Sequence, residues 1–156
     1  MSAEPLTHER TFRIRHYECD SYGHVNHANY VRYMQEAAFD ATAAAGYDVA
    51  RYEQMNRAWL VRETDITYLM PLVYGDSVVV KTWVGNFRRV RSHRMYELRR
   101  LSDGEMVAQG STDWVFLEAD SLRPVSIPEE LISAFFPNGP TEETAAREPF
   151  PNATTR

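Results

Sequence analysis

Residues 27–45 read HANYVRYMQEAAFDATAAA, and this stretch decides which fold the rest of the chain can adopt. Its apolar side chains recur at helical spacing. They are Tyr30, Val31, Met34, Ala37, Ala38, Ala41 and Ala45. Asn26 before them is a suitable N-cap, and Gly46 after them is a suitable left-handed stop. We therefore predict one long helix over residues 27–45 that is apolar around most of its girth.

The segments on either side of this helix carry the patterns of β-strands. Residues 10–17 alternate with a period of two, which places Phe12 and Ile14 on the same side. A short helical or looped piece is expected at residues 49–56. Four further strand-like runs follow it, at residues 58–69, 77–87, 91–101 and 105–117. The chain thus predicts the order strand, long helix, four strands.

The connections between the last four runs contain turn-forming residues. Residues 71–76 and the pair Asp103-Gly104 are of this kind, which predicts that the runs pair in sequence as antiparallel hairpins. A short final helix is expected over residues 128–136, with Pro128 in its first turn. A five-stranded antiparallel sheet has a face to bury, and the long helix is the element able to cover it. The expected fold class is α+β, with the sheet wrapped around one central helix.

Length and composition set the organisation of the chain and exclude several classes of function. The 156 residues suit one domain, which we place at residues 10–136 between tails at 1–9 and 137–156. A net charge of -5 argues against general binding to nucleic acid or an anionic membrane. No apolar run reaches membrane-spanning length, and the single Cys19 can form no intrachain disulfide, so we expect a cytoplasmic protein. No cofactor is implied. Unpaired sheet edges favour a homo-oligomer, either a dimer or a dimer of dimers.

Turn-forming residues concentrate where the first strand meets the helix, in residues 17–30, which read YECDSYGHVNHANY. In this stretch the chain resembles the hotdog-fold acyl-CoA thioesterases of the 4-hydroxybenzoyl-CoA thioesterase family. Further matches follow in order at residues 64–71, 75–76, 91–93, 108–112, 123–124 and 127–128. The resemblance spans about residues 10–136. It implies the hotdog fold and hydrolysis of the thioester of a fatty or aromatic acyl-CoA.

Asp20 is the candidate catalytic residue. Judged from its position alone, an Asp in such a loop is typical of an Asx-turn, and the resemblance is what implies catalysis. A carboxylate can attack a thioester carbonyl or deprotonate a water that attacks it, and the sequence leaves both routes open. The amides at a helix N-terminus can stabilise the developing oxyanion. This predicts a catalytic role for the backbone N–H of His27, with Ala28 beside it.

Neighbouring side chains are candidates for binding the substrate. They are Tyr17, Gly23, His24, Asn26 and Tyr30, of which the two tyrosines are also typical core residues. His24 and His27 lack a third ligand at suitable spacing, so we expect no metal site. Cys19 is interpreted as a small buried hydrophobe rather than a nucleophile. Glu36 is the competing carboxylate and ranks well below Asp20, because Arg32 lies one turn before it and Asp40 one turn after it, an arrangement that favours a solvated or interface ion pair.

Arginines gather between residues 88 and 100 of an otherwise acidic chain. They are Arg88, Arg89, Arg91, Arg94, Arg99 and Arg100. One guanidinium group can donate two parallel hydrogen bonds to the oxygens of a phosphate. We therefore predict that Arg88, Arg89 and Arg91 contact the phosphates of coenzyme A. The alternative is a charged strand face that protects a sheet edge.

Two other functions stay open at this stage. An acyl-ACP thioesterase would use the same arginines to meet an acidic carrier protein. A non-catalytic hotdog module would bind acyl-CoA without turning it over. Measurement of thiol release from acyl-CoA and acyl-ACP carrying the same acyl chain separates all three.

Overall fold

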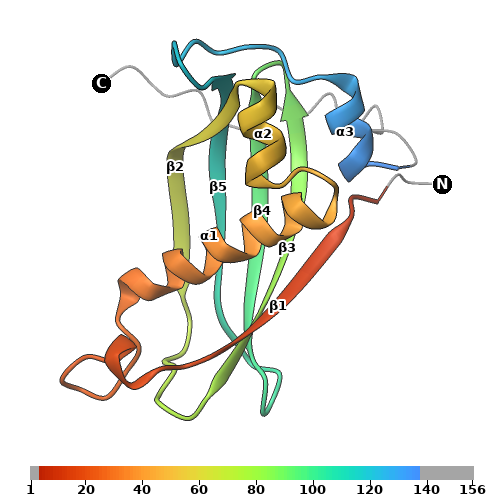
Figure 1. The fold of residues 1–156 in the computed structure, drawn as a ribbon. Helices are drawn as coiled ribbons and strands as arrows, with labels where there is room; N and C mark the ends of the chain where they lie inside the picture. Colours follow the sequence, from red (N-terminus) through yellow and green to blue (C-terminus); the bar gives the residue numbers. More distant parts are fainter. Residues whose placement is uncertain (1–3, 138–156) are drawn as a thin grey trace, which may run out of the picture.

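The computed structural model describes residues 4–137 and contains a five-stranded antiparallel sheet with three α-helices against it (Figure 1). The strands are β1 (Thr7–Arg13), β2 (Arg57–Tyr68), β3 (Ser77–Arg88), β4 (Arg91–Arg100) and β5 (Met106–Glu118). The helices are α1 (His27–Ala44), α2 (Val49–Met55) and α3 (Glu129–Phe135), with a 3-10 turn at His16–Glu18. The predicted C-terminal tail, apart from residue 137, lies outside the described residues.

Helix α1 crosses the concave face of the sheet, as the sequence predicts (Figure 1). Asn26 caps it, its side-chain oxygen accepting a hydrogen bond from the Ala28 amide at 2.9 Å. Its buried side chains include Tyr30, Tyr33, Met34, Ala37, Ala38 and Ala41. Val31 and Phe39 are exposed, so the apolar girth exceeds what the sheet of one chain covers.

The strand order is β1-β3-β4-β5-β2, which corrects one predicted connection. Hairpins join β3 to β4 and β4 to β5, but β2 pairs with β5 and not with β3. Residues 69–76 therefore form a crossing segment that runs past the end of the sheet. The amides of Leu69 and Met70 bond to the Val107 carbonyl, and Leu72 is fully buried. The turn residues were recognised correctly, but turn chemistry alone does not specify which strands pair.

Strand β1 occupies residues 7–13 rather than the predicted 10–17, and it pairs with β3 from Thr7–Trp83 to Arg13–Ser77. The chain leaves the sheet at Arg15 because the Glu18 carboxylate accepts the Arg15 amide at 2.7 Å. That bond closes the 3-10 turn in place of further ladder bonds. Pro128 likewise is the N-cap of α3 and not a residue of its first turn.

The core divides into two clusters. The larger lies beneath α1 and includes Leu72, Tyr96 and Leu98. The second lies towards α2 and α3 and contains Tyr47, Val84, Phe116, Ile127, Leu131, Phe135 and Phe136. Among residues 4–137, no helix has both the length and the apolar character needed to cross a membrane.

Candidate active site

The turn between β1 and α1 holds Asp20 in a defined conformation. The Asp20 amide donates to the His24 carbonyl at 2.7 Å, and Gly23 follows with a φ of 80°, a value that favours glycine. Asp20 Oδ1 accepts from the amides of Tyr22 at 2.9 Å and His24 at 3.3 Å. This is an Asx-turn, the ordinary role of such a residue. Within residues 4–137 the other oxygen, Oδ2, makes no hydrogen bond, and the carboxylate is exposed.

Buried polar groups hold this turn against the helix. The Glu18 carbonyl accepts from the Asn26 amide at 2.8 Å and from Asn29 Nδ2 at 2.9 Å. The Glu18 side chain is 6% exposed and bonds to the Arg15 amide, so this carboxylate is structural. Burial raises the pKa of the Tyr33 hydroxyl, and the neighbouring Glu18 raises it further. Sequence reasoning missed the supporting roles of Glu18 and Asn29. No sequence pattern near Glu18 indicates its role, and Asn29 was noted only as part of the motif at residues 17–30.

The crossing segment 69–76 supports the same turn from the other side. The Val25 amide donates to the Leu72 carbonyl at 2.8 Å, and a β-bridge joins His24 to Val73. The corrected strand connection is therefore part of the architecture that fixes Asp20.

The first amides of α1 differ in their availability. The Ala28 amide is taken by the Asn26 side chain, and the Asn29 amide donates to the Asn26 carbonyl at 2.9 Å. Among the described residues, no acceptor is recorded for the amide of His27. Of the two predicted donors, the Ala28 amide is occupied and the His27 amide remains available, at the positive end of the helix dipole.

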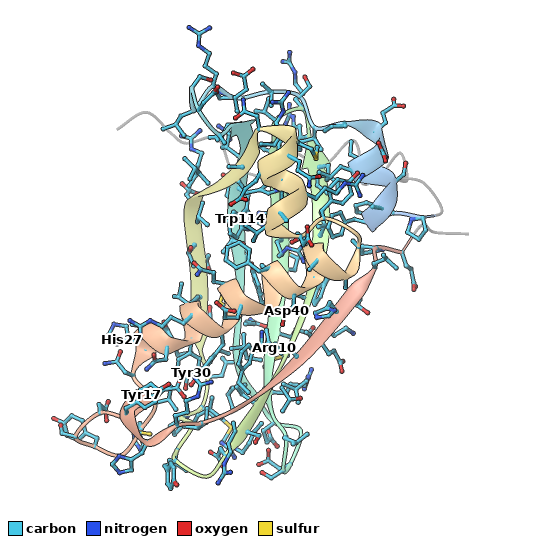
Figure 2. The ribbon with its side chains drawn as sticks, in the orientation of Figure 1. Arg10, Tyr17, His27, Tyr30, Asp40 and Trp114 are labelled. Carbon is cyan, nitrogen blue, oxygen red and sulfur yellow. The ribbon has the colours of Figure 1, made fainter. Side chains whose placement is uncertain are left out.

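The aromatic residues near the turn separate into core and surface. Tyr30 is 3% exposed and meets Tyr68 edge-on, with ring centroids 5.1 Å apart. Burial raises the pKa of both tyrosines. The Tyr68 hydroxyl donates to the His27 carbonyl at 3.1 Å, which links β2 to the helix start. Tyr17 is 75% exposed, and its hydroxyl accepts from Arg15 (Figure 2).

The structure therefore brings together Asp20, Gly23, His24, Asn26 and His27, but not all of the predicted site. The β3–β4 hairpin, which carries Arg88, Arg89 and Arg91, lies at the end of the sheet opposite to the Asp20 turn. Arg88 is in register with Arg91 at that end, whereas Ser77, at the other end of β3, is in register with Arg13 near the turn. Twelve strand residues separate these ends by about 36 Å. Within one chain these arginines do not meet Asp20.

The remaining candidates have structural partners. Arg10 of β1 pairs with Asp40 at 2.6 Å and with Glu36 at 3.8 Å (Figure 2). Arg32, the partner considered from sequence, donates instead to Asn29. Cys19 packs against the larger core cluster. No three His, Cys, Asp or Glu side chains in the described part of the chain gather as a metal site.

Comparison with known proteins identifies the family to which this chain belongs. Residues 5–135 match the family model of the acyl-ACP thioesterase N-terminal domain. The chain belongs to the acyl-ACP thioesterase family. A curated relative, the acyl-acyl carrier protein thioesterase ATL3 of Arabidopsis thaliana, is 28% identical over 128 residues, covering 82% of this chain and 67% of that protein.

Solved structures confirm the hotdog fold for this thioesterase. The DHNA-CoA thioesterase from Staphylococcus aureus superposes with a TM-score of 0.73 and 26% identity over 85% of each chain. The 4-hydroxybenzoyl-CoA thioesterase from Pseudomonas sp. strain CBS-3 gives a TM-score of 0.76 at 20% identity, covering 82% of this chain and 98% of that one. The predicted resemblance is confirmed, and the protein is a thioester hydrolase of the hotdog type.

Proposed function

We propose that this thioesterase hydrolyses acyl-CoA and that Asp20 is its catalytic carboxylate. One observation carries the proposal: the open oxygen Oδ2 of Asp20 belongs to the same turn that leads into the uncapped amide of His27. A carbonyl bound between them would have its carbon facing the carboxylate and its oxygen facing the amide.

The chemistry needs these two groups and little else. Asp20 either removes a proton from the attacking water or attacks the carbonyl carbon itself, giving a mixed anhydride that water then cleaves. In both routes the carbon–sulfur bond breaks, and the electron pair leaves with sulfur. Strong acid assistance is not required, because a thiol with a pKa near 8.5 is a good leaving group.

The test is Asp20→Asn, assayed by thiol release from short, long and aromatic acyl-CoAs. Loss of a general base or nucleophile should lower kcat at least about a hundredfold. Asp103→Asn is a matched control, since Asp103 Oδ1 also accepts a backbone amide two residues on, from Glu105 at 3.1 Å. Equal small effects of the two substitutions would show that Asp20 is a turn residue only.

In this proposal the arginines that bind the CoA phosphates come from the β3–β4 hairpin of a second copy of the chain. Antiparallel pairing of two β2 edges would reverse one sheet against the other, bringing the partner's hairpin end towards the Asp20 end of this chain. Arg88→Gln and Arg91→Gln should then raise KM for acyl-CoA while leaving KM for the N-acetylcysteamine thioester of the same acyl group unchanged. A parallel rise for both substrates would contradict a contact with the CoA phosphates.

Acyl-ACP is the second candidate substrate, favoured by the matching family model and by the 28% identical relative. Acyl-CoA is favoured by the 26% identical DHNA-CoA thioesterase, which this chain matches over 85% of both lengths. The same acyl group presented on CoA and on ACP decides between them. A kcat/KM at least tenfold higher for ACP would replace CoA as the proposed carrier.

A further inference from the structure

A cavity of about 660 Å³ lies away from the Asp20 turn, between the C-terminal half of α1, helix α2 and the sheet. Its apolar walls include Ala38, Val84, Phe87, Trp114 and Phe135. Figure 2 labels Trp114 between β2 and α2, apart from His27 at the start of α1. The volume falls within the range of roughly 300–1,000 Å³ typical of small-molecule sites. The mostly apolar lining thus suits a small apolar ligand.

A buried positive charge lies in this apolar setting. Arg94 of β4 lines the cavity and is 5% exposed. Its guanidinium donates one hydrogen bond, to Thr82 Oγ1 at 3.2 Å, and lies 5.5 Å from the Phe135 ring centroid. Among residues 4–137 no carboxylate lies within ion-pair distance of it. A buried charge without a counter-charge is costly, so this position calls for an anion that the described residues do not supply.

Neutral donors accompany Arg94 in the same cavity. The hydroxyl of Tyr52 and Nε1 of Trp59 are both buried and lie near each other, and neither has another hydrogen-bond partner within the described residues. Burial raises the pKa of Tyr52 to about 12, so this hydroxyl keeps its proton and can donate. Ser92 adds a further hydroxyl to the lining. Buried donors beside a cation that has no counter-charge among the described residues form a site for oxygen acceptors.

The carboxylates at the cavity wall do not satisfy this need. Asp40 is held by Arg10 at 2.6 Å, and Asp48 caps α2 by accepting the Arg51 amide at 2.8 Å. Glu53 is exposed on α2. A second cation, Arg57, also lines the cavity, and its hydrogen bonds go to the carbonyls of Met55 and Asn56. None of these three carboxylates forms an ion pair with Arg94.

We propose that this cavity binds the carboxylate of an apolar organic acid, with Arg94 pairing with the carboxylate and the aromatic and aliphatic walls enclosing the tail. The carboxylate has two possible sources. It belongs to a free acid such as the product of thioester hydrolysis, or to the far end of a dicarboxylic acyl group whose other end is the thioester. The binding itself does not depend on the proposed function, whereas the second source does.

The first test measures binding of octanoate and of octanol, which have the same chain length and differ in the charged group. Trp59 and Trp114 line the cavity, so tryptophan fluorescence reports its occupation. Octanoate should bind the parent protein at least tenfold more tightly than octanol, and Arg94→Met should abolish that difference. Arg99→Met is the control, since Arg99 is exposed on the same strand. Equal affinities for octanoate and octanol in the parent protein would overturn the proposal even if Arg94→Met failed to fold.

The second test identifies the source of the carboxylate. It compares the CoA thioesters of octanoic acid and octanedioic acid as substrates, and octanoate as an inhibitor. A kcat/KM at least tenfold higher for the diacid thioester, lost in Arg94→Met, assigns the site to the substrate. Inhibition by octanoate that Arg94→Met relieves, without preference for the diacid, assigns it to the free acid. Absence of both effects, with Asp20→Asn still inactive, would overturn a role for Arg94 in ligand binding while leaving the proposed function intact.

Discussion

Gly110 illustrates at the scale of one residue why a sequence position needs a particular side chain. A Cβ placed there would lie 2.5 Å from the carbonyl oxygen of Asp65 and 3.2 Å from the terminal methyl of Met34. The carbonyl belongs to the paired strand β2 and cannot move aside without breaking the ladder. The glycine therefore permits β2, β5 and α1 to approach one another closely.

We expect Gly110→Ala to lower the free energy of unfolding by about 1–3 kcal/mol, the usual cost of overpacking a core. Urea denaturation followed by circular dichroism measures it. Gln109→Ala, at the exposed neighbouring position, should change stability by less than about 0.5 kcal/mol. Unchanged stability of Gly110→Ala would show that the strands separate more easily than this packing allows.

The arginines show at the same scale how much of the site was predictable from sequence. Their concentration in residues 88–100 was visible, and Arg88, Arg89 and Arg91 were selected as phosphate contacts, but nothing in the sequence distinguished Arg94. In the structure Arg100 pairs with Asp103 at 2.8 Å, whereas Arg94 is buried with no acidic partner among residues 4–137. Alternation along β4 separates Arg94 from Arg91 and Arg99, but Arg94 and Arg100 share a face and differ in how deeply each is buried. The unpaired charge could be found only once burial and partners were known.

The N-terminus of α1 is an element whose stability and chemistry depend on one cap. Asn26 occupies the Ala28 amide, leaving the His27 amide open. We expect Asn26→Ala to destabilise the protein by about 1 kcal/mol, because an amide loses its acceptor. Asn26→Ser should stay within a few tenths of a kcal/mol of the parent. Thermal and urea unfolding of the three proteins measure this, and equal stability of Asn26→Ala and the parent would argue against the cap.

Elements with strong local periodicity were predicted well, and their connections less so. Helix α1 ends within one residue of its expected boundary, since apolar spacing, cap and stop agree there. Residues 71–76 look like a hairpin turn, yet they connect β2, at one edge of the sheet, to β3, next to the strand at the opposite edge. The choice depends on Leu72 filling the core beneath α1 and on its carbonyl accepting the Val25 amide. Such long-range contacts are not encoded in a short stretch of sequence.

At the scale of the whole molecule, the surface left uncovered by one chain follows the edge strand β2. Leu60, Val61, Tyr68, Leu69 and Met70 are all exposed there, and Val31 and Phe39 add exposed apolar area on α1. Among the described strands β2 pairs with β5 along one edge and with no strand along the other. An edge strand with apolar flanks is a template for pairing with another chain, so we predict a homodimer formed through β2.

The double substitution Leu60→Lys with Val61→Lys should convert this dimer to a monomer, because lysines on an edge strand oppose pairing with a second edge. Sedimentation should then give one 18.0 kDa chain in place of two. Leu101→Lys is the control, since Leu101 is also exposed but lies in the β4–β5 turn.

If the partner supplies the arginine hairpin, KM for acyl-CoA should rise at least tenfold in the monomer while its circular dichroism spectrum stays that of the parent. A parent protein that sediments as a monomer and retains full activity would refute both the dimer and the shared site, because β2 would then be an edge with no occupant.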